Sequence, residues 1–316
     1  MIVGIVTKIA RGVLPPGVKR RLRGLSRKAR LAPLICPGLP PLACVDVGAS
    51  YYPHGKWRLL LESANTQWIA VEPNVANVGY VNQWPWPCSV QVVGTGLSAQ
   101  GGAQTLYVTN VDSGSSLLEP HVPPSMRHRF TNLAYFFPVT PRTIDTITLA
   151  DVLKPVASDR PVFVKLDTQG TELSILSAAD ESLRSHRILG VELEATLLAT
   201  PLMRGSGRFW EACRYMEELG YELLDVKLVR GPSRLGLEKT RGKTYLNECD
   251  AVFGLRPDLL GEMPADRAAA MCAFYLCNDL YEDALALLEP GQPAGTYLEG
   301  HGCDLPALRA AVTALA

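Results

Sequence analysis

The chain has 316 residues, 47% of them hydrophobic and 20% charged, so it can bury a large core as one large or two modest domains. Its 31 basic residues balance its 31 acidic ones, but nine of the basic residues lie within residues 1–30, which contain no acidic residue. Removing these nine leaves 22 basic against 31 acidic residues, which excludes a nucleic-acid-binding basic face that extends over the whole body.

Residues 1–30, which we call the basic arm, lack the pattern of a secretory signal. The apolar run at their start, Met1 to Val6, is only six residues long and precedes the basic residues instead of following them. No stretch of the chain approaches the roughly 18 uninterrupted apolar residues of a membrane-spanning helix. The sequence therefore predicts a cytoplasmic protein. Its basic arm is either a solvated tail or a segment that lies on the anionic inner face of a membrane.

The chain divides into three predicted segments. Residues 32–43 are rich in proline and predict a linker into the first strand, so the basic arm and linker together occupy residues 1–41. A body of residues 42–258 follows, and residues 259–316 form a helical appendage. Its alanine-rich pattern at 265–289 predicts a helical hairpin that serves packing or self-association into a homo-oligomer.

Apolar strands and a helix alternate at the start of the body. Strands are predicted at 43–47, 68–71 and 90–93, with a helix at 56–63 between the first two. This alternation is typical of βαβ units and predicts a parallel sheet with both faces covered. The segment 99–147 interrupts it with a short strand and a long polar loop, and a loop of this length suggests a function.

The alternation resumes after residue 160. The pattern predicts four elements in this order: strand 161–167, helix 171–185, strand 188–193 and helix 209–219. Gly220 is a suitable stop for the last helix. Two apolar runs, at 221–229 and 249–255, follow with no helix between them, which predicts an antiparallel pair at one edge of the sheet.

Eight cysteines show neither a C-x-x-C pair nor a spacing with histidine that fits zinc. Cys44 and Cys249 lie inside apolar strand patterns, as expected of buried thiols in a reducing cytosol. No cluster of histidines and carboxylates calls for another metal, so we predict a site without metal.

Carboxylates end or follow four of the predicted strands. In a parallel open sheet, ligands bind beyond the carboxyl ends of the strands, so these side chains should meet. Any one of them is as well explained as a turn residue or a helix cap, and only the set favours a site. The set, which we call the acidic rim, is Asp46, followed by Gly48; Glu72, followed by Pro73; Asp167; and Glu192 with Glu194.

The acidic rim favours a cofactor that contains a ribose but no phosphate. Glu72 lies 24 residues beyond Gly48, where a carboxylate is well placed to accept both hydroxyls of a ribose. Neither G-x-G-x-x-G nor G-x-x-x-x-G-K-[ST] is present, so neither a pyrophosphate nor a triphosphate has its glycine-rich loop. S-adenosylmethionine has a ribose, no phosphate, and a positive sulfonium that suits acidic surroundings.

Eight motifs follow one another along the body. They are VDVGAS at 45–50, AVEPN at 70–74, GLS at 96–98, SGSSL at 113–117, TIDTITLADVL at 143–153, VFVKLDTQGTELSIL at 162–176, LGVELE at 189–194 and ECDAVFGL at 248–255. Their order and spacing resemble those of the FkbM-type S-adenosylmethionine-dependent methyltransferases. The most specific motif, KLDTQGTELSIL, is similar to the family's Lys-hydrophobic-Asp-x-x-Gly-x-Glu signature. The resemblance covers about residues 42–255 and leaves out the basic arm and the C-terminal helices.

This resemblance implies an α/β fold, the Rossmann-like seven-stranded class I methyltransferase sheet with an antiparallel strand at its edge. It also implies an enzyme that uses S-adenosylmethionine to methylate a hydroxyl of a sugar, a glycolipid or a polyketide-type small molecule. The acceptor is then a small molecule or a glycan, and we predict no nucleic-acid partner.

The resemblance assigns roles to individual residues. Asp46 and Gly48 would contact the methionyl part of the cofactor, and Glu72 would hold the ribose. Leu97 and Ser98 would border the adenine, and Asp167 would lie beside the methyl group. The whole predicted cofactor set is Asp46, Gly48, Ser50, Glu72, Pro73, Leu97, Ser98 and Asp167.

Two positions depart from the family pattern. Ser50 stands where the family commonly has asparagine, with the next glycine delayed to Gly55, and Ala99 stands where an acidic residue is usual. These departures favour an alternative, a catalytically silent binding module that docks partners through its basic arm or helical appendage. A dehydrogenase is a third, weaker hypothesis.

Methyl transfer to a hydroxyl needs in-line attack and removal of the hydroxyl proton. Asp167 is the candidate base, and its alternative role is to bind the amino group of the cofactor. Glu172 and Glu194 are further catalytic candidates, although Glu172 is also a favourable acid for the first turn of a helix. His54 and the loop 121–138 are candidates on the acceptor side.

Overall fold

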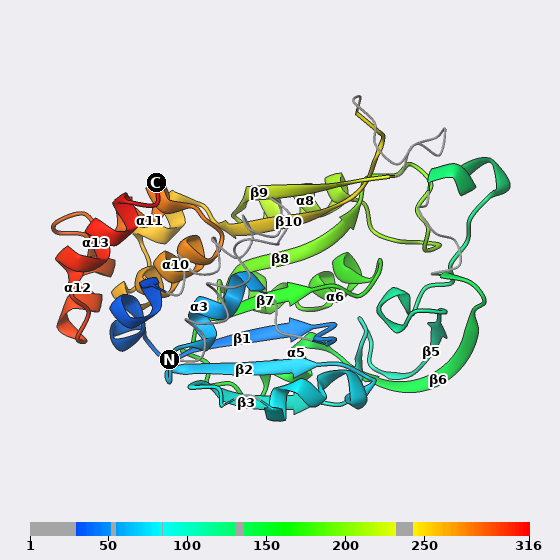
Figure 1. Cartoon of the computed structure of the whole chain (residues 1–316), viewed down its shortest axis with the longest axis horizontal. Helices are drawn as coiled ribbons and strands as arrows, with labels where there is room; N and C mark the ends of the chain where they lie inside the picture. Colours follow the sequence, from blue (N-terminus) through cyan, green and yellow to red (C-terminus); the bar gives the residue numbers. More distant parts are fainter. Residues whose placement is uncertain (1–29, 52–54, 84, 130–135, 232–242) are drawn as a thin grey trace, which may run out of the picture.

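A seven-stranded sheet forms the centre of the protein, for which a computed structural model describes residues 30–51, 55–83, 85–129, 136–231 and 243–316. The strand order is β3-β2-β1-β7-β8-β10-β9 (Figure 1). The strands are β1 (Leu42–Val47), β2 (Thr66–Val71), β3 (Ser89–Val93), β7 (Val162–Leu166), β8 (Ile188–Thr196), β9 (Tyr221–Arg230) and β10 (Leu246–Leu255). Each of the predicted strands is present, so the expected Rossmann-like methyltransferase sheet is confirmed.

Strand β10 is the antiparallel member of the sheet. It pairs antiparallel with both β8 and β9, while the other strands run parallel to one another. The antiparallel strand is therefore the last in sequence, as expected. It lies one place in from the edge, which β9 occupies.

The central strands are apolar because helices cover them. All residues of β1 and β7 are buried, including Cys44, and this continuous burial is typical of a parallel strand covered on both sides. Cys249 in β10 is buried as well, as predicted. The helices that pack on the sheet include α3 (Arg58–Leu61), α6 (Glu172–Ala178), α7 (Asp180–Arg184), α8 (Phe209–Glu218) and α10 (Ala265–Cys277).

The predicted helix at 171–185 is wrong in one respect, because it is two short helices. Ala179 ends α6 and begins α7, with a backbone (φ −103°, ψ 22°) that leaves the helical region. Asp180 starts the new turn, where a carboxylate near the helix N-terminus is favourable.

A second, three-stranded sheet occupies part of the segment that was predicted as a long loop. It contains β4 (Gly96–Leu97), β5 (Gly102–Val108) and β6 (Thr140–Ile147), in the order β4-β6-β5. The predicted short strand lies within β5, but β6 was not predicted, and the two strands form a long antiparallel pair. This small sheet lies beyond the carboxyl ends of the central parallel strands (Figure 1).

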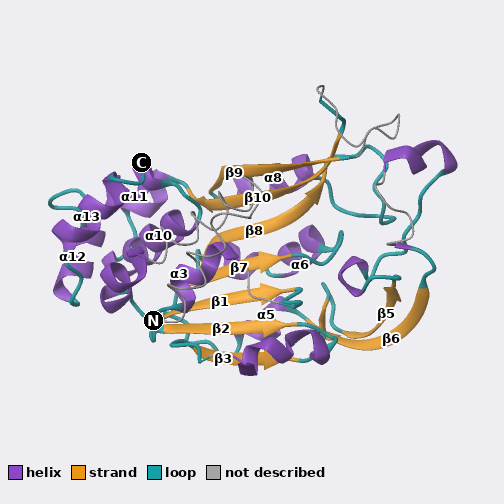
Figure 2. Ribbon diagram, viewed as in Figure 1, coloured by secondary structure: helices purple, strands orange, loops and turns teal. Residues whose placement is uncertain are grey.

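The C-terminal segment is larger than the predicted hairpin. The hairpin corresponds to α10 and α11 (Tyr281–Leu287), but α12 (Pro293–Gly300) and α13 (Leu305–Thr313) follow, and α9 (Pro257–Gly261) precedes. Figure 2 shows these helices gathered at the amino ends of the parallel strands, opposite the small sheet. The hairpin prediction missed α12 and α13 because their helical patterns are short and interrupted by proline and glycine.

Helix α10 is built into the core of the sheet. The ring of Phe274 stacks on Phe163 of β7 with a centroid distance of 4.7 Å. Gly190 and Gly254, which are paired across β8 and β10, leave the space for the helix. A Cβ atom on Gly190 would lie 2.6 Å from Phe274, and one on Gly254 would clash with Met271.

The proline-rich segment before β1 is not an extended linker. Residues 30–35 are helical and a 3-10 helix, η1 (Cys36–Gly38), follows. Leu31 and Ile35 are fully buried, and Gly38 packs against the backbone of α12. One hydrophobic cluster extends from Leu31 to Val312, so parts of all three predicted segments share a single core. Within the described residues, no helix has the length and apolarity needed to cross a membrane.

Candidate functional site

The sheet brings the acidic strand ends to one edge. In the register of the central strands, Asp46 of β1 lies opposite Lys165 of β7, and Lys165 lies opposite Glu192 of β8. Asp167 follows β7 directly, and Glu194 extends β8 on the same side as Glu192. The structure thus gathers the predicted rim at the carboxyl ends of β1, β2, β7 and β8.

Gly48 is the point where three of these strand ends meet. It adopts φ +76°, a left-handed conformation that favours glycine. A Cβ atom at this position would clash with the carbonyl oxygen of Asp167. The N–H of Gly48 donates to the carbonyl of Val71, and the N–H of Asp167 donates to the carbonyl of Val47. Any side chain at position 48 would therefore push β1 and the Asp167 loop apart.

Glu72 is held by two donors at the end of β2. The hydroxyl of Ser50 donates to its Oε2 at 2.7 Å, and the N–H of Asn74 donates to its Oε1 at 2.9 Å. Burial raises the pKa of Glu72, while these two hydrogen bonds oppose that rise. Pro73 is half-buried beside it. A carboxylate has about four acceptor positions, so two further donors can still be accepted here.

Asp46 of the rim forms a buried ion pair with Lys165. Asp46 is 2% exposed and Lys165 is 8% exposed. The ammonium of Lys165 lies 3.4 Å from Asp46 Oδ1 and 3.4 Å from Asp167 Oδ2. Asp46 Oδ1 accepts no hydrogen bond within the described part of the chain. It is therefore a buried oxygen, close to the Lys165 ammonium, that can still accept a hydrogen bond.

Asp167 and Glu194 are joined by a residue that the sequence did not single out. The side-chain amide of Gln169 donates to Asp167 Oδ1 at 3.2 Å and to Glu194 Oε2 at 2.6 Å. Burial, followed by the charges of Asp167 and Glu248, raises the pKa of Glu194 well above its ordinary value. The side chain of Asp167 remains 41% exposed, so it is the accessible member of this group.

Glu172 faces its own loop and not the rim. It is 4% exposed, and its carboxylate accepts from the N–H of Thr168 at 2.7 Å and from the N–H of Gly170 at 2.9 Å. Burial raises its pKa to about 7, although these hydrogen bonds oppose the rise. Glu172 therefore fixes the turn that presents Asp167 and Gln169. Its predicted catalytic role stays a prediction.

Leu97 and Ser98 lie at the β4 edge of the small sheet. Both are buried, Leu97 at the end of β4 and Ser98 directly after it. The hydroxyl of Ser98 pairs with that of Thr146 at 2.7 Å and accepts from the N–H of Gly101 at 2.9 Å. The hydroxyl of Ser98 thus holds β4 against β6, and its contact with a cofactor stays a prediction.

Residues 109–120, which we call the strap, connect both ends of the rim. Asn74, after β2, donates to Asp112 at 2.9 Å. At the other end, the buried hydroxyl of Ser116 donates to the carbonyl of Gln169 at 2.9 Å. The SGSSL motif was the sequence signal for this segment, but nothing in the sequence indicated which residues the strap would contact.

Several predicted acceptor-side residues cannot be placed. His54 lies outside the described residues, and so do residues 130–135 of the predicted loop. His121 is described, and its imidazole lies 3.3 Å from the guanidinium of Arg204.

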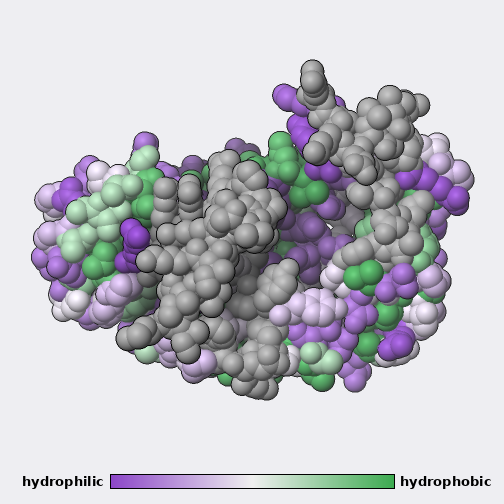
Figure 3. All heavy atoms as spheres, viewed as in Figure 1, coloured by the Kyte–Doolittle hydropathy of each residue, from purple (hydrophilic) through white to green (hydrophobic). Residues whose placement is uncertain are grey.

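Figure 3 shows hydrophilic residues gathered between the central strands and the small sheet.

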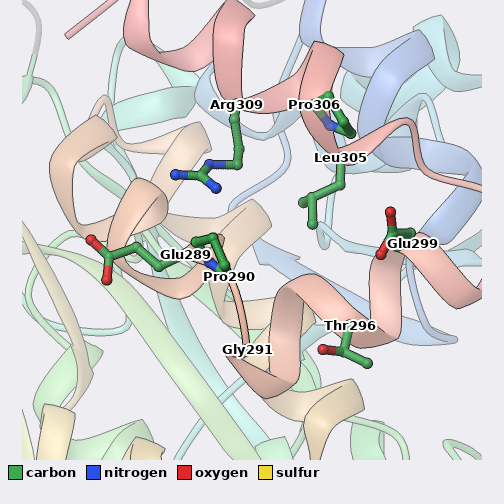
Figure 4. A pocket seen from close by; sticks show the side chains of 8 residues that line it. All are labelled: Glu289, Pro290, Gly291, Thr296, Glu299, Leu305, Pro306 and Arg309. Carbon is green, nitrogen blue, oxygen red and sulfur yellow. The ribbon is translucent and has the colours of Figure 1, made fainter.

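Two other features of the molecule bear on a second site. Among the described residues, no group of three or more His, Cys, Asp or Glu residues is arranged to hold a metal, and metal independence stays a prediction. A cavity of about 490 Å³ lies between α11, α12 and α13, lined by residues that include Glu289, Glu299 and Arg309 (Figure 4). It lies at the far end of the molecule from the rim (Figure 1).

Comparisons with known proteins place the rim in a family. Residues 46–223 match the family model described as the methyltransferase FkbM domain. No curated protein matches the chain. An antibiotic-related methyltransferase of solved structure is 14% identical, with 72% of this chain and 93% of that chain covered and a TM-score of 0.29.

Two further solved structures are similar at the same low level. A SAM-dependent methyltransferase from Anabaena variabilis is 10% identical, with 72% of this chain and 82% of that chain covered and a TM-score of 0.34. A 16S rRNA adenine methyltransferase from Catenulisporales acidiphilia is 12% identical, with 73% and 92% covered and a TM-score of 0.27.

Proposed function

Because the chain belongs to the FkbM methyltransferase family and is thus an S-adenosylmethionine-dependent methyltransferase, we propose that it methylates a hydroxyl oxygen. The proposed acceptor is a sugar, a glycolipid or a polyketide-type small molecule. The observation that carries this proposal is the convergence of Asp46, Glu72 and Asp167 around Gly48 at one edge of the sheet. The family assignment favours methyl transfer over the dehydrogenase hypothesis.

The residues of the rim fit S-adenosylmethionine. Asp46 Oδ1 is a buried acceptor without a hydrogen bond in the described chain, which suits the α-ammonium group of the cofactor. Glu72 is fixed by Ser50 and Asn74 and keeps acceptor positions for two ribose hydroxyls. Gly48 lets the backbone come close to the ligand. We therefore assign Asp46, Gly48 and Glu72 to cofactor binding.

Asp167 is the proposed base. When bound, S-adenosylmethionine supplies an electrophilic methyl group on a positive sulfur. Asp167 would accept the proton of the attacking hydroxyl, a contribution typically worth about 10² to 10⁴ in rate. Its exposed side chain, with Oδ1 held by Gln169 and Oδ2 near Lys165, supports this role. Its alternative role, binding the amino group of the cofactor, is separated by the experiment below.

We assign Glu172 the role of positioning the turn that carries Asp167, and Glu194 a role on the acceptor side. Glu172 closes the turn at 168–170 and is too buried to reach a substrate. Glu194 is linked to Asp167 through Gln169, and its raised pKa favours a neutral carboxyl that can donate a hydrogen bond to an acceptor oxygen.

The test has a binding part and a turnover part. Calorimetric titration with S-adenosylmethionine should give measurable heat, and labelled S-adenosylmethionine should methylate one or more members of a panel of glycans, lipids and polyketides. Glu72→Ala should weaken cofactor binding by about 10-fold to 100-fold, because it removes hydrogen bonds to a charged group. Glu62→Ala, an exposed acid in an i,i+4 pair, is the matched control.

Asp167→Ala separates the two roles of this residue. As the base, Asp167 is needed for turnover more than for affinity, so the variant should keep cofactor binding within a few fold and lose about 10²-fold or more in turnover. A variant that loses affinity and keeps turnover at saturating cofactor would make Asp167 a binding residue.

The competing function is a catalytically silent binding module, supported by the departures at Ser50 and Ala99. The hydrogen bond from Ser50 to Glu72 argues against it, because the altered position still serves the rim. Absence of heat with both S-adenosylmethionine and S-adenosylhomocysteine would favour the silent module over the enzyme.

The partners and location are proposals as well. We propose a cytoplasmic protein without a nucleic-acid partner, with self-association through the C-terminal helices and contact between residues 1–30 and an anionic membrane surface. Co-sedimentation with vesicles of phosphatidylserine and phosphatidylcholine tests the membrane contact. Deletion of residues 2–29 should abolish binding, and equal binding of the shortened chain would remove this proposal.

A further inference from the structure

Lys165 is a cation in a rim that otherwise carries acids. It lies in β7, between β1 and β8, and it is 8% exposed. Burial alone would lower the pKa of a lysine, because the charged form loses its hydration. Here the pKa of Lys165 is nevertheless raised, since the charges of Asp46, Asp167 and Glu192 outweigh burial. The ammonium is therefore the fixed positive charge beneath the rim.

The charged groups around Lys165 come from every element that meets it. Asp46 lies beside it on β1, Glu192 on β8, and Asp167 at the end of its own strand. Glu72, at the end of β2, also senses its charge. Beyond Glu192 lies Lys56 of the 3-10 helix η2 (Gly55–Trp57), 3.3 Å from Glu192 Oε1.

Negative and positive side chains therefore alternate along a row that crosses the sheet. The row runs negative at Asp46, positive at Lys165, negative at Glu192 and positive at Lys56. Lys56 is the nearest cation to Glu192, whereas the ammonium of Lys165 lies 3.4 Å from both Asp46 and Asp167. Helix α10 packs on β7 through Phe274, which stacks on Phe163 and carries no charge.

Removal of Lys165 would leave two carboxylates without their shared cation. Asp46 is buried, and an isolated buried carboxylate is unstable in its charged form. The two carboxylates would then repel each other, and the charged state of the pair would be less stable. A neutral carboxyl attracts a cationic ligand less strongly than a carboxylate does. The loss of Lys165 would therefore weaken binding of the sulfonium and the ammonium of the cofactor.

We propose that Lys165 is a positioning residue that keeps Asp46 and Asp167 ionised and fixed for the bound cofactor. It acts through the two carboxylates and needs no contact with the acceptor. The proposal rests on the methyltransferase function proposed above and assigns a role to a residue outside the cofactor set predicted from the sequence.

The experiment measures cofactor binding against pH, so it needs no known acceptor. The Kd values of S-adenosylmethionine and S-adenosylhomocysteine are determined by calorimetry for the wild type, Lys165→Met and Lys165→Arg. Between about pH 8 and about pH 6, the ratio of the Lys165→Met Kd to the wild-type Kd should rise, by up to about eightfold for a carboxyl pKa raised about three units above the ordinary value of about 3.9 for aspartate. This follows because an opposite charge nearby holds a carboxyl pKa about one to three units lower.

Two controls isolate the charge. Lys165→Arg keeps the cation and should restore a pH dependence close to that of the wild type. Lys154→Met makes the same change at an exposed Lys–Asp pair, where the lysine side chain is 75% exposed, and should leave the Kd unchanged at every pH. A Lys165→Met protein that folds and binds with the pH dependence of the wild type overturns the proposal.

A measurement on the wild type covers the case in which Lys165→Met fails to fold. With ¹³C-labelled lysine, the Cε resonance that Lys165→Arg removes should keep its ammonium position at about pH 11, where solvated lysines with a pKa of about 10.4 have lost their proton. Titration at the solvated value contradicts the proposal. If the wild type binds neither compound at any pH, the methyltransferase function fails and not the role of Lys165.

Discussion

The hydroxyl of Ser50 donates to Glu72 at 2.7 Å, at the position where the family pattern has asparagine. Ser50→Ala removes a bond that lowers the pKa of Glu72. We expect about 3-fold to 10-fold weaker binding of S-adenosylhomocysteine, with a larger loss at about pH 6 than at about pH 8. Calorimetry measures the Kd, and Ser89→Ala on β3 is the control.

Ser50→Asn should recover most of the affinity. Equal affinities of the wild type and the three variants would show that Ser50 does not contribute to cofactor binding.

Glu172 makes stability depend on pH with a defined sign. Its pKa is about 7 in the folded chain against an ordinary 4.5, so between these values the folded chain holds a proton that the unfolded chain has lost. Stability therefore falls as pH rises through this window. From about pH 5 to about pH 7.5, we expect Glu172 to lower the free energy of unfolding by about 2 kcal/mol.

The Glu172→Gln variant tests this contribution. It cannot ionise, so it should lack that part of the pH dependence, and its loss of stability relative to the wild type should be smaller at about pH 7.5 than at about pH 5. Urea unfolding at both pH values gives the two differences. Parallel stability profiles for the two proteins would mean that Glu172 is already ionised at about pH 5.

At this scale, the sequence predicted the acids better than their partners. Asp46, Glu72 and Asp167 could be placed at one edge because a parallel sheet aligns its strand ends. Gln169 was missed, because its two contacts depend on a left-handed backbone (φ +58°) that the residue type does not indicate. Glu172 was placed on the correct helix, but its inward direction follows from the loop that it closes.

Helix α10 offers a test at the level of an element. Phe274→Ala removes the ring that stacks on Phe163 and should cost about 3–5 kcal/mol. Gly190→Ala places a Cβ 2.6 Å from the same ring and should cost about 1–3 kcal/mol by overpacking. In the double variant the new methyl group partly fills the space left by the ring. The double variant should therefore lose less free energy of unfolding than the two single variants added together.

Denaturant unfolding of the two single variants and the double variant gives the coupling energy. Gly205→Ala is not a suitable control, because Gly205 has φ +87°, but Gly79→Ala is, since nothing lies within 4 Å of a Cβ there. Strictly additive losses would show that Gly190 does not meet Phe274.

Elements were predicted well where burial and periodicity agree. The strands β1 and β7 are short apolar runs bounded by turn residues, and both were located to within about a residue. Strand β6 was missed and β5 was found only in part, because both strands are polar and poorly buried, so no alternating pattern marks them. The helical residues 32–35 were assigned to a linker because the prolines of 32–43 outweighed the apolar Ile35, which is buried.

For the whole molecule, the position of α10 predicts that the C-terminal helices cannot be removed. Residues 268–277 are buried almost completely, and they cover Phe163 and the paired glycines of β8 and β10. A chain that ends at Leu255 should therefore show no cooperative thermal unfolding. A chain that ends at Asp304 loses only α13, with its buried Leu308 and Val312, and should keep a cooperative transition at a lower midpoint. Differential scanning calorimetry distinguishes the two, and native-like unfolding of the shorter chain would make the C-terminal helices an independent unit.

The strap has a consequence for the order of events in a catalytic cycle. It is tied to Asn74 beside Glu72 and to Gln169 beside Asp167, so one segment touches both halves of the proposed cofactor site. An acceptor that binds against the strap would alter affinity for the methyl donor, and the donor would alter affinity for the acceptor by the same factor, as thermodynamic linkage requires. Binding of the two substrates should then be interdependent, and the loss of the positive charge on sulfur after methyl transfer would weaken the binding of both products together.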